Sequence, residues 1–193
     1  MEPAALSPLA CAGLLVGSFV IGGACQSAWF AHPFSKRFTR PLDGGCTFRG
    51  RRLFGDNKTT RGFVVIVPAT ALAMAGLGTA APRLGLAVWP EALPGLLLLG
   101  AVAALGLMLG ELPNSFVKRQ LDVEPGAPPK HRLGRVISAV ADRLDSVVGA
   151  LVGVSLVVEL SWKTALFCLL IGPPIHGLFS VLLWVLGVKK RAG

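Results

Sequence analysis

The sequence predicts an all-α integral membrane protein with about five transmembrane helices and two basic cytoplasmic inserts. Of the 193 residues, 53% are hydrophobic and 15% are charged, and the mean hydropathy is +0.66. Ordinary globular chains are about 25% charged, so this composition indicates a chain that lies in a bilayer. The apolar residues are gathered into long runs, which basic segments rich in glycine or proline separate. We therefore expect residues 1–193 to form a single polytopic membrane domain.

Five apolar runs set the expected helices. A helix needs roughly 20 residues to cross about 30 Å of hydrocarbon. Runs of this length occur at residues 9–31, 63–81, 93–112, 137–160 and 164–188. The most apolar part of the fourth run, residues 147–158, is too short to cross alone, so its helix should begin near Ile137. A cleaved signal sequence is the alternative for the first run, but Glu2 stands where a basic segment is typical, so we expect a retained anchor.

The distribution of positive charge predicts the orientation. Of the 19 Lys and Arg residues, all except Arg83 and Lys163 lie after the first run, between the third run and the start of the fourth, or at the C-terminus. Basic loops stay in the cytoplasm. We therefore expect a multi-pass protein of the cell (plasma) membrane, with its N-terminus outside and its C-terminus in the cytoplasm.

Two cytoplasmic inserts are expected, at residues 32–62 and 113–135. In the first, residues 47–49 are predicted to form a short hairpin with residues 52–54, with Gly50 at the bend. The second contains several prolines and a glycine, which cannot sustain a helix. It is expected to be a mobile linker, and a lid over an active site is the alternative.

Glycines and cations alternate along the first insert. Glycine-rich turns can point several N–H groups at one anion, so this tract suits a polyphosphate. Residues 50–59 come close to a phosphate-binding P-loop, but Gly55 and Lys58 are too far apart and no buried strand precedes them, so we exclude an ATPase. A basic face that attracts anionic lipid heads is the alternative. The candidate binding residues are Gly55, Asn57, Lys58, Thr59 and Arg61.

Polar residues also gather where the third run meets the cytoplasm. Pro113 is expected to interrupt the helix, and Ser115 and Lys118 share a face if the helix resumes. Glu111 is a carboxylate at the membrane boundary, so it needs a partner. A polar helix end that merely stops the span is the alternative. The candidate residues here are Asn114, Ser115, Lys118 and Arg119.

Two carboxylates mark the start of the fourth run. Asp142 and Asp145 are three residues apart, so they lie on one helix face, which Ser138, Gly149 and Gly153 continue as a close-packing stripe. Two carboxylates in a partly dry site suit Mg²⁺, which takes few protein oxygens and adds substrate phosphate. A structural ion pair with Arg143 or with a neighbouring helix is the alternative.

Together these motifs resemble the CDP-archaeol synthases, which are relatives of the CDP-diacylglycerol synthases. The resemblance runs in order from about Pro33 to the C-terminus and includes residues 43–45 and 48–62. Its most specific part is the pairing of S-F-V-K-R at residues 115–119 with D-R-L-D at residues 142–145.

The resemblance implies a Mg²⁺-dependent cytidylyltransferase that joins CTP to a membrane lipid phosphate and releases pyrophosphate. Its catalytic residues would be Asp142, Asp145, Lys118 and Arg119. Asp142 and Asp145 would bind the metal, with Asp56 as a further ligand. Lys58 and Arg61 would join Lys118 and Arg119 in holding the phosphates, and neutral hydrogen bonds would come from Asn57, Thr59, Asn114 and Ser115.

The expected partners are CTP, the lipid phosphate and the bilayer, and no nucleic acid. A small transporter is a rival class, but it would place carboxylates near the bilayer midplane in repeated halves, and the sequence has no repeat. A non-catalytic protein that binds anionic lipid is a second rival, but it has no evident use for Asp142 and Asp145. The sequence leaves open the oligomeric state and whether the lipid is an isoprenoid ether or an acyl ester.

Overall fold

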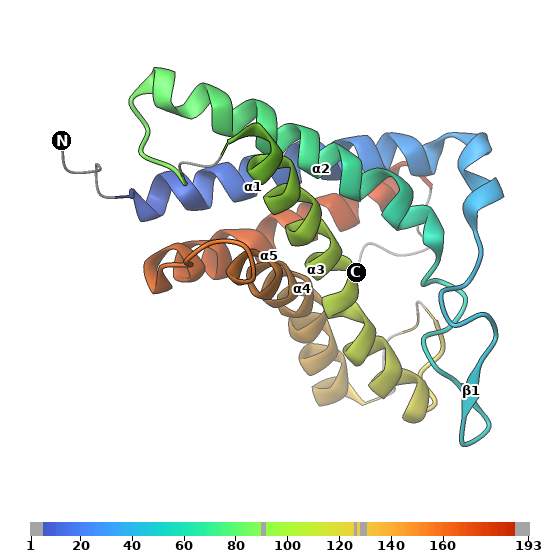
Figure 1. The fold of residues 1–193 in the computed structure, drawn as a ribbon. Helices are drawn as coiled ribbons and strands as arrows, with labels where there is room; N and C mark the ends of the chain where they lie inside the picture. The colour runs from blue at the N-terminus through green and yellow to red at the C-terminus, as the bar shows by residue number, and fades with distance from the viewer. Residues whose placement is uncertain (1–5, 90–91, 126, 128–130, 188–193) are drawn as a thin grey trace.

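A computed structural model shows a protein built from five long helices (Figure 1). The structure describes all residues except 1–5, 90–91, 126, 128–130 and 188–193. The long helices are α1 (Pro8–Ala31), α2 (Thr60–Ala80), α3 (Leu93–Gln120), α4 (Arg132–Ser155) and α5 (Trp162–Val185). The short elements are the 3₁₀ helices η1 (Pro33–Phe38) and η2 (Ala81–Leu84) and the strands β1 (Thr47–Phe48) and β2 (Arg51–Arg52). Helix α1 packs against α2 and α5, and α3 packs against α2 and α4.

Four helices in the described part of the chain are long and apolar enough to cross a membrane: α1, α2 with η2, α3 and α5. This makes the chain a helical multi-pass membrane protein, as predicted. The expected count of five spans is not confirmed, because α4 falls outside this group. Asp142, Arg143 and Asp145 lie near the middle of α4, so its apolar residues favour one face instead of surrounding the helix.

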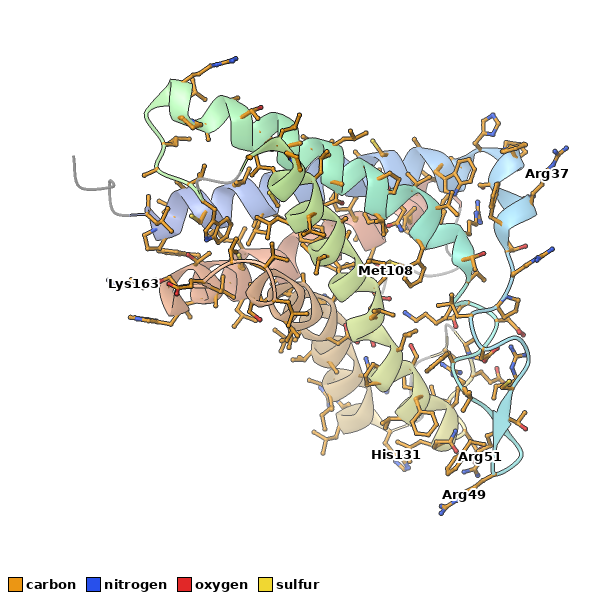
Figure 2. The ribbon with its side chains drawn as sticks, in the orientation of Figure 1. Arg37, Arg49, Arg51, Met108, His131 and Lys163 are labelled. Carbon is orange, nitrogen blue, oxygen red and sulfur yellow. The ribbon has the colours of Figure 1, made fainter. Side chains whose placement is uncertain are left out.

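The loops with few cations lie together at one end of the molecule. The Ser7 N–H donates to the carbonyl of Ala87 at 2.9 Å, and the Trp89 indole donates to the carbonyl of Glu159 at 3.3 Å. These bonds join the start of α1, the α2–α3 loop and the α4–α5 loop. Figure 2 shows Lys163 at this end of the molecule.

The basic first insert lies at the opposite end, next to the C-terminus of α3. Arg51 donates to the carbonyl of Gln120 at 2.5 Å and forms an ion pair with Asp122 at 2.5 Å. Figure 2 shows Arg37, Arg49 and His131 at this end as well. The fold therefore places the basic insert at one end of the molecule and the loops with few cations at the other, as the charge pattern predicts. Lys130 and the C-terminal residues 189–191 lie outside the described residues.

The hairpin of the first insert differs from the predicted pairing. Thr47 lies opposite Arg52 and Phe48 opposite Arg51, so the predicted pairing of 47–49 with 52–54 was wrong. Arg49 and Gly50 form the two-residue turn, with φ angles of 52° and 76°. Two consecutive left-handed residues make the tight turn that matches strand twist, and Arg49 was not recognised as one of them.

A buried aspartate holds the rest of this insert together. The carboxylate of Asp43 accepts hydrogen bonds from Arg52 at 2.6 Å and from the backbone N–H groups of Phe54 at 3.0 Å, Gly55 at 3.1 Å and Gly45 at 3.1 Å. Burial alone opposes ionisation, but Arg52 and these N–H groups outweigh it and hold the pKa of Asp43 well below its usual range. The charged carboxylate thus fixes the turn that leads to Gly55.

Helix α3 continues through Pro113 to Gln120, so the expected interruption of the helix after Leu112 was wrong. A proline inside a helix removes one backbone hydrogen bond and strains one turn. The helix continues despite this loss, and it packs closely against α4 along this stretch. The connection between α3 and α4 is therefore residues 121–131, shorter than the predicted insert at 113–135. Part of the predicted linker, residues 126 and 128–130, lies outside the described residues.

Glycines bring α3 and α4 into backbone contact. A Cβ atom added at Gly149 would lie 2.2 Å from the carbonyl oxygen of Gly106, and one added at Gly110 would lie 2.5 Å from the carbonyl oxygen of Asp145. A Cβ added at Gly153 would likewise meet the Val102 carbonyl oxygen at 2.5 Å. Small residues four apart permit such an approach. The predicted stripe on α4 is confirmed for Gly149 and Gly153.

Candidate active site

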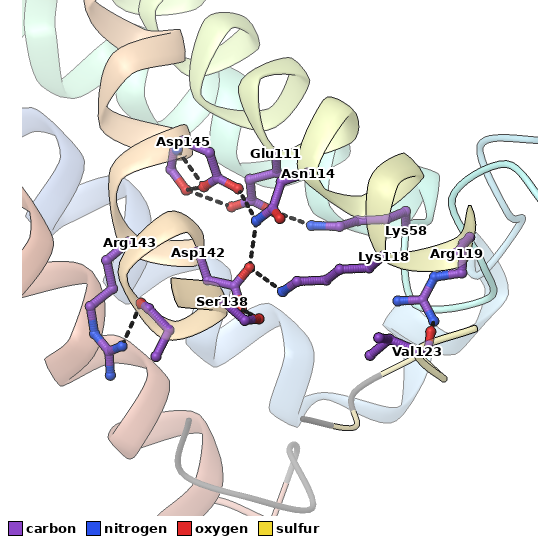
Figure 3. Close-up of polar contacts among 12 residues, drawn as sticks. Lys58, Glu111, Asn114, Lys118, Arg119, Val123, Ser138, Asp142, Arg143 and Asp145 are labelled. Atoms are coloured by element: carbon purple, nitrogen blue, oxygen red, sulfur yellow. Dashed lines mark hydrogen bonds and ion pairs between the residues drawn. The ribbon is translucent and has the colours of Figure 1, made fainter. Parts of the chain in front are cut away.

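A continuous set of polar contacts joins α3, α4 and the first insert near the insert end of the molecule (Figure 3). We call it the carboxylate network. Its members are Lys58, Glu111, Asn114, Lys118, Asp142, Asp145 and Ser146.

Asn114 bridges the two aspartates of α4. Its Nδ2 donates to Asp142 Oδ1 at 2.6 Å and to Asp145 Oδ2 at 2.8 Å. The Lys118 ammonium pairs with the same oxygen of Asp142, and Ser138 Oγ lies 3.5 Å from the other oxygen. Asp142 and Asp145 therefore share the face of α4 that meets α3, as the three-residue spacing predicts.

Glu111 connects the first insert to this pair. The Lys58 ammonium forms an ion pair with Glu111, and both side chains are 19% exposed. Ser146 Oγ lies 3.0 Å from Glu111 Oε1 and 3.1 Å from Asp145 Oδ1. Glu111 was expected to need a partner, and Lys58 is that partner. Ser146 was missed, because a buried serine after Asp145 carries no signal of its own in the sequence.

The network contains more negative than positive charge. Three carboxylates, from Glu111, Asp142 and Asp145, face two ammonium groups, from Lys58 and Lys118. Asp145 receives hydrogen bonds from the neutral donors Asn114 and Ser146. An added cation would offset this excess charge.

The donor set also fits Mg²⁺. This ion takes a few carboxylate oxygens and completes its octahedron with water or substrate phosphate. Asp142 Oδ1 accepts from Asn114 and Lys118, which leaves Oδ2 of Asp142 as the oxygen for a metal. Within the described residues, no group of three or more His, Cys, Asp or Glu side chains is placed to hold a metal. A metal held by Asp142 and Asp145 would therefore need oxygens from substrate or water.

Some predicted site residues make other contacts. Arg61 donates to Ser35 Oγ, with Nε at 2.9 Å, and to the carbonyl of Phe30 at 2.5 Å, and its guanidinium lies 4.6 Å from the Phe30 ring centroid. These bonds tie α1 and η1 to α2, which gives Arg61 a structural role. Asp56 accepts from Arg52 at 2.8 Å, and its side chain is 76% exposed.

The remaining predicted residues lie around the network. Asn57 is exposed, and Thr59 is the N-cap residue of α2. Ser115 is buried on α3. Arg119 is also buried, and its Nη1 donates to the carbonyl of Val123 instead of joining the network. Arg119, Gly55 and Asp56 line a separate cleft.

An apolar groove leads to the network between α3 and α4. Its volume is about 770 Å³, and its walls include Leu105, Leu109, Leu144 and Val148. Asp145 is the one charged residue among those that line it. The groove therefore joins the carboxylate network to the apolar faces of two helices.

These features define a class of protein: a multi-pass helical membrane protein with a carboxylate and lysine site where its helices meet a basic insert. The family model described as CarS-like CDP-archaeol synthase matches residues 30–192. The chain therefore belongs to the CDP-archaeol synthase family, and the predicted resemblance is confirmed.

Relatives named CDP-archaeol synthase support this assignment. The protein from Halorubrum lacusprofundi is 36% identical over 163 residues, which cover 79% of this chain and 83% of the relative. The Methanococcoides burtonii protein is 32% identical over 186 residues, covering 85% and 97%. The Thermofilum pendens protein is 34% identical over 151 residues, which are 77% of this chain and 64% of that relative. The matched region thus spans less than two thirds of the Thermofilum relative.

A solved structure is similar in fold. It comes from work on "an intramembrane enzyme for archaeal membrane lipids biosynthesis" and superposes with a TM-score of 0.57 at 25% sequence identity. The match covers 84% of this chain and 91% of that one.

Proposed function

We propose that this chain transfers the cytidylyl group of CTP to the phosphate of a membrane lipid. A lipid phosphate oxygen attacks the α-phosphorus of CTP, the bond from that phosphorus to the bridging oxygen breaks, and pyrophosphate leaves with the electron pair. The observation that carries the proposal is the position of the Asp142–Asn114–Asp145 cluster, between two lysines and at the end of an apolar groove. Membership of the CDP-archaeol synthase family supports it.

The network suits this reaction because the reaction needs little proton transfer. A phosphate nucleophile is already largely ionised at neutral pH, so the main task is to hold two anions in line and offset their charge. Lys58 approaches from the insert and Lys118 from α3, so the two cations come from separate elements. Each ammonium has three donors, so each can contact a phosphate and keep its carboxylate partner.

We propose Mg²⁺ as the cofactor, held by Asp142 and Asp145. When bound, it would offset charge on the phosphates and orient them. Asn114 fixes the relative position of the two carboxylates, and Ser146 holds Asp145 from the other side. Asp56 is left out of this proposed metal site because it lines the separate cleft and makes no contact within the carboxylate network.

The apolar groove supports a lipid substrate. A lipid whose hydrocarbon chain lies in the groove between α3 and α4, which has a volume of about 770 Å³, would bring its headgroup to Asp145. The names of the relatives indicate archaeol, an ether lipid, for those proteins.

Purified protein incubated with labelled CTP, Mg²⁺ and separate isoprenoid ether and acyl ester phosphates tests the function. The expected result is a labelled CDP-lipid and an equal amount of pyrophosphate with at least one lipid. A transporter or a lipid-binding scaffold would form neither product with any lipid, and that outcome would sink the proposal.

Lys58→Ala is expected to raise the Michaelis constant for CTP more than that for the lipid. Loss of a charge-assisted phosphate contact costs about 1.5–3 kcal/mol, on the order of tenfold to a hundredfold. The variant also leaves the Glu111 carboxylate without its ion-pair partner. The double variant Lys58→Ala/Glu111→Gln removes this unpaired charge, so it shows which part of the effect comes from the lost lysine itself. Lys163→Ala, at the opposite end, is the matched control. Unchanged CTP kinetics with weaker binding to anionic vesicles would make the insert a membrane-surface patch.

We propose that the insert end faces the cytoplasm, with the N-terminus outside and the chain in the cell membrane. The charge separation between the two ends supports this orientation. In a variant without the four native cysteines, a cysteine at Arg49 should react with a membrane-impermeant thiol reagent only from the cytoplasmic side. A cysteine at Lys163 should react from outside. The reverse pattern of labelling contradicts the proposed topology.

A further inference from the structure

A second cleft lies beside the carboxylate network, between the first insert and the segment that follows α3. Its volume is about 430 Å³. Its charged lining residues are Arg51, Arg52, Asp56, Arg119, Asp122 and Glu124. Neither the family match nor the proposed reaction gives this cleft a role.

Arg119 provides an unused hydrogen-bond donor in this cleft. The residue is only 8% exposed, and its Nη1 donates to the carbonyl of Val123. Its Nε is buried and has no hydrogen-bond partner in the part of the chain that the structure describes. Buried polar groups are normally paired. Arg119 lines the cleft and its Nε lies beside Gly55, another lining residue, so a ligand that enters the cleft with an acceptor would give this donor a partner.

The charges of the cleft favour a neutral ligand over a phosphate. Three arginines are matched by three carboxylates among its lining residues. Arg51 is paired with Asp122 at 2.5 Å and Arg52 with Asp56 at 2.8 Å. A triphosphate needs surplus positive charge, which this cleft lacks. A flat polar ring fits a guanidinium beside a carboxylate if its edge carries acceptors for the guanidinium and a donor for the carboxylate.

The cleft is also connected to the two lysines of the network. The Lys58 N–H donates to the Gly55 carbonyl at 3.2 Å, so both residues belong to one turn. Arg119 follows Lys118 directly on α3. Both walls of the cleft therefore continue into a lysine that we assign to phosphate.

We propose that this cleft binds the cytosine base of the nucleotide. Arg119 Nε–H donates to the acceptor edge formed by O2 and N3, and the Asp56 carboxylate accepts from the exocyclic amino group. Carboxylates accept from the cytosine N4 amino group in other recognition sites. Uracil reverses this pattern, with O4 facing the carboxylate and N3–H facing the guanidinium. The proposal rests on the proposed function and assigns its nucleotide specificity to Asp56 and Arg119.

Asp56→Asn tests the proposal without disturbing a buried residue. The ratio of kcat/KM for CTP to kcat/KM for UTP should fall about threefold to tenfold, a modest effect because the carboxylate is largely exposed to solvent. The dependence of the rate on Mg²⁺ concentration should not change. Glu159→Gln, at the opposite end of the molecule, should leave both quantities as in the unmodified protein.

Arg119→Lys keeps the charge but removes the Nε–H donor, since Lys cannot reproduce the guanidinium geometry. The Michaelis constant for CTP should rise on the order of tenfold, with a smaller effect on the lipid constant. A melting measurement shows whether the variant is folded.

An unchanged CTP to UTP ratio in Asp56→Asn would overturn the proposal, and an altered Mg²⁺ dependence with an unchanged ratio would instead make Asp56 a metal ligand. Equal use of CTP and UTP by the unmodified protein would refute recognition of cytosine by this cleft, but it would not contradict the proposed transferase activity. Activity with neither nucleotide would refute the proposed function itself.

Discussion

Replacing Asp145 with asparagine should lower turnover at least about a hundredfold while leaving the protein folded. The change removes one negative charge from the proposed metal site, and loss of one strong electrostatic contact to a reacting phosphate commonly has an effect of this size. Asn114 and Ser146 donate to different oxygens of Asp145, so asparagine, which has one acceptor oxygen, can keep one of these two hydrogen bonds.

The measurement is the rate as a function of Mg²⁺ concentration, together with the melting temperature of the purified variant. Asp142→Asn is the companion variant, and it can retain some rate at raised Mg²⁺ because Lys118 stays close to that position. Ordinary Mg²⁺-dependent activity in Asp145→Asn would remove this residue from the proposed metal site.

The second large effect is expected from Gly149→Ala. The new Cβ would lie 2.2 Å from the Gly106 carbonyl oxygen, so α3 and α4 would have to separate. Overpacking of this kind costs about 1–3 kcal/mol, although alanine by itself favours a helix over glycine by about 0.5–1 kcal/mol. Turnover should fall together with stability, because α3 and α4 carry the facing halves of the carboxylate network.

Gly76→Ala on α2 is the matched control. A Cβ at this position would meet nothing within 4 Å, so the variant should keep its activity and be as stable as the unmodified protein or more so. Thermal unfolding in detergent and the rate of CDP-lipid formation measure both effects. If Gly149→Ala matched Gly76→Ala in both, the backbone contact between α3 and α4 would be contradicted.

The features that the sequence predicted best are those that depend on local patterns. Hydropathy located all five long helices, and four of them carry an apolar stretch long enough to cross a membrane. The three-residue spacing placed Asp142 and Asp145 on one face of α4, since the helical repeat alone decides that. The distribution of Lys and Arg along the sequence predicted which segments lie at the basic end of the molecule and which lie at the opposite end.

Contacts between distant segments explain the differences. Pro113 lies within α3, which packs against α4, and nothing in the local sequence reports that packing. Arg61 is predicted to hold phosphate, and the structure adds contacts with Ser35 and Phe30 that the local sequence does not report. Ser146 was missed because its importance comes from Glu111, 35 positions away in the chain.

The backbone contact between α3 and α4 also explains how the chemistry is aligned. Along α3, Gly106, Gly110, Asn114 and Lys118 follow one another at intervals of four residues. The same face of α3 therefore contacts the backbone of α4 at Gly106 and Gly110 and carries Asn114 and Lys118 of the carboxylate network further along. A shift of one residue between Gly106 and Lys118 would turn the reactive groups about 100° away from α4. A change in the length of a loop would leave this alignment intact, whereas the length of this stretch is set by the pitch of the α-helix.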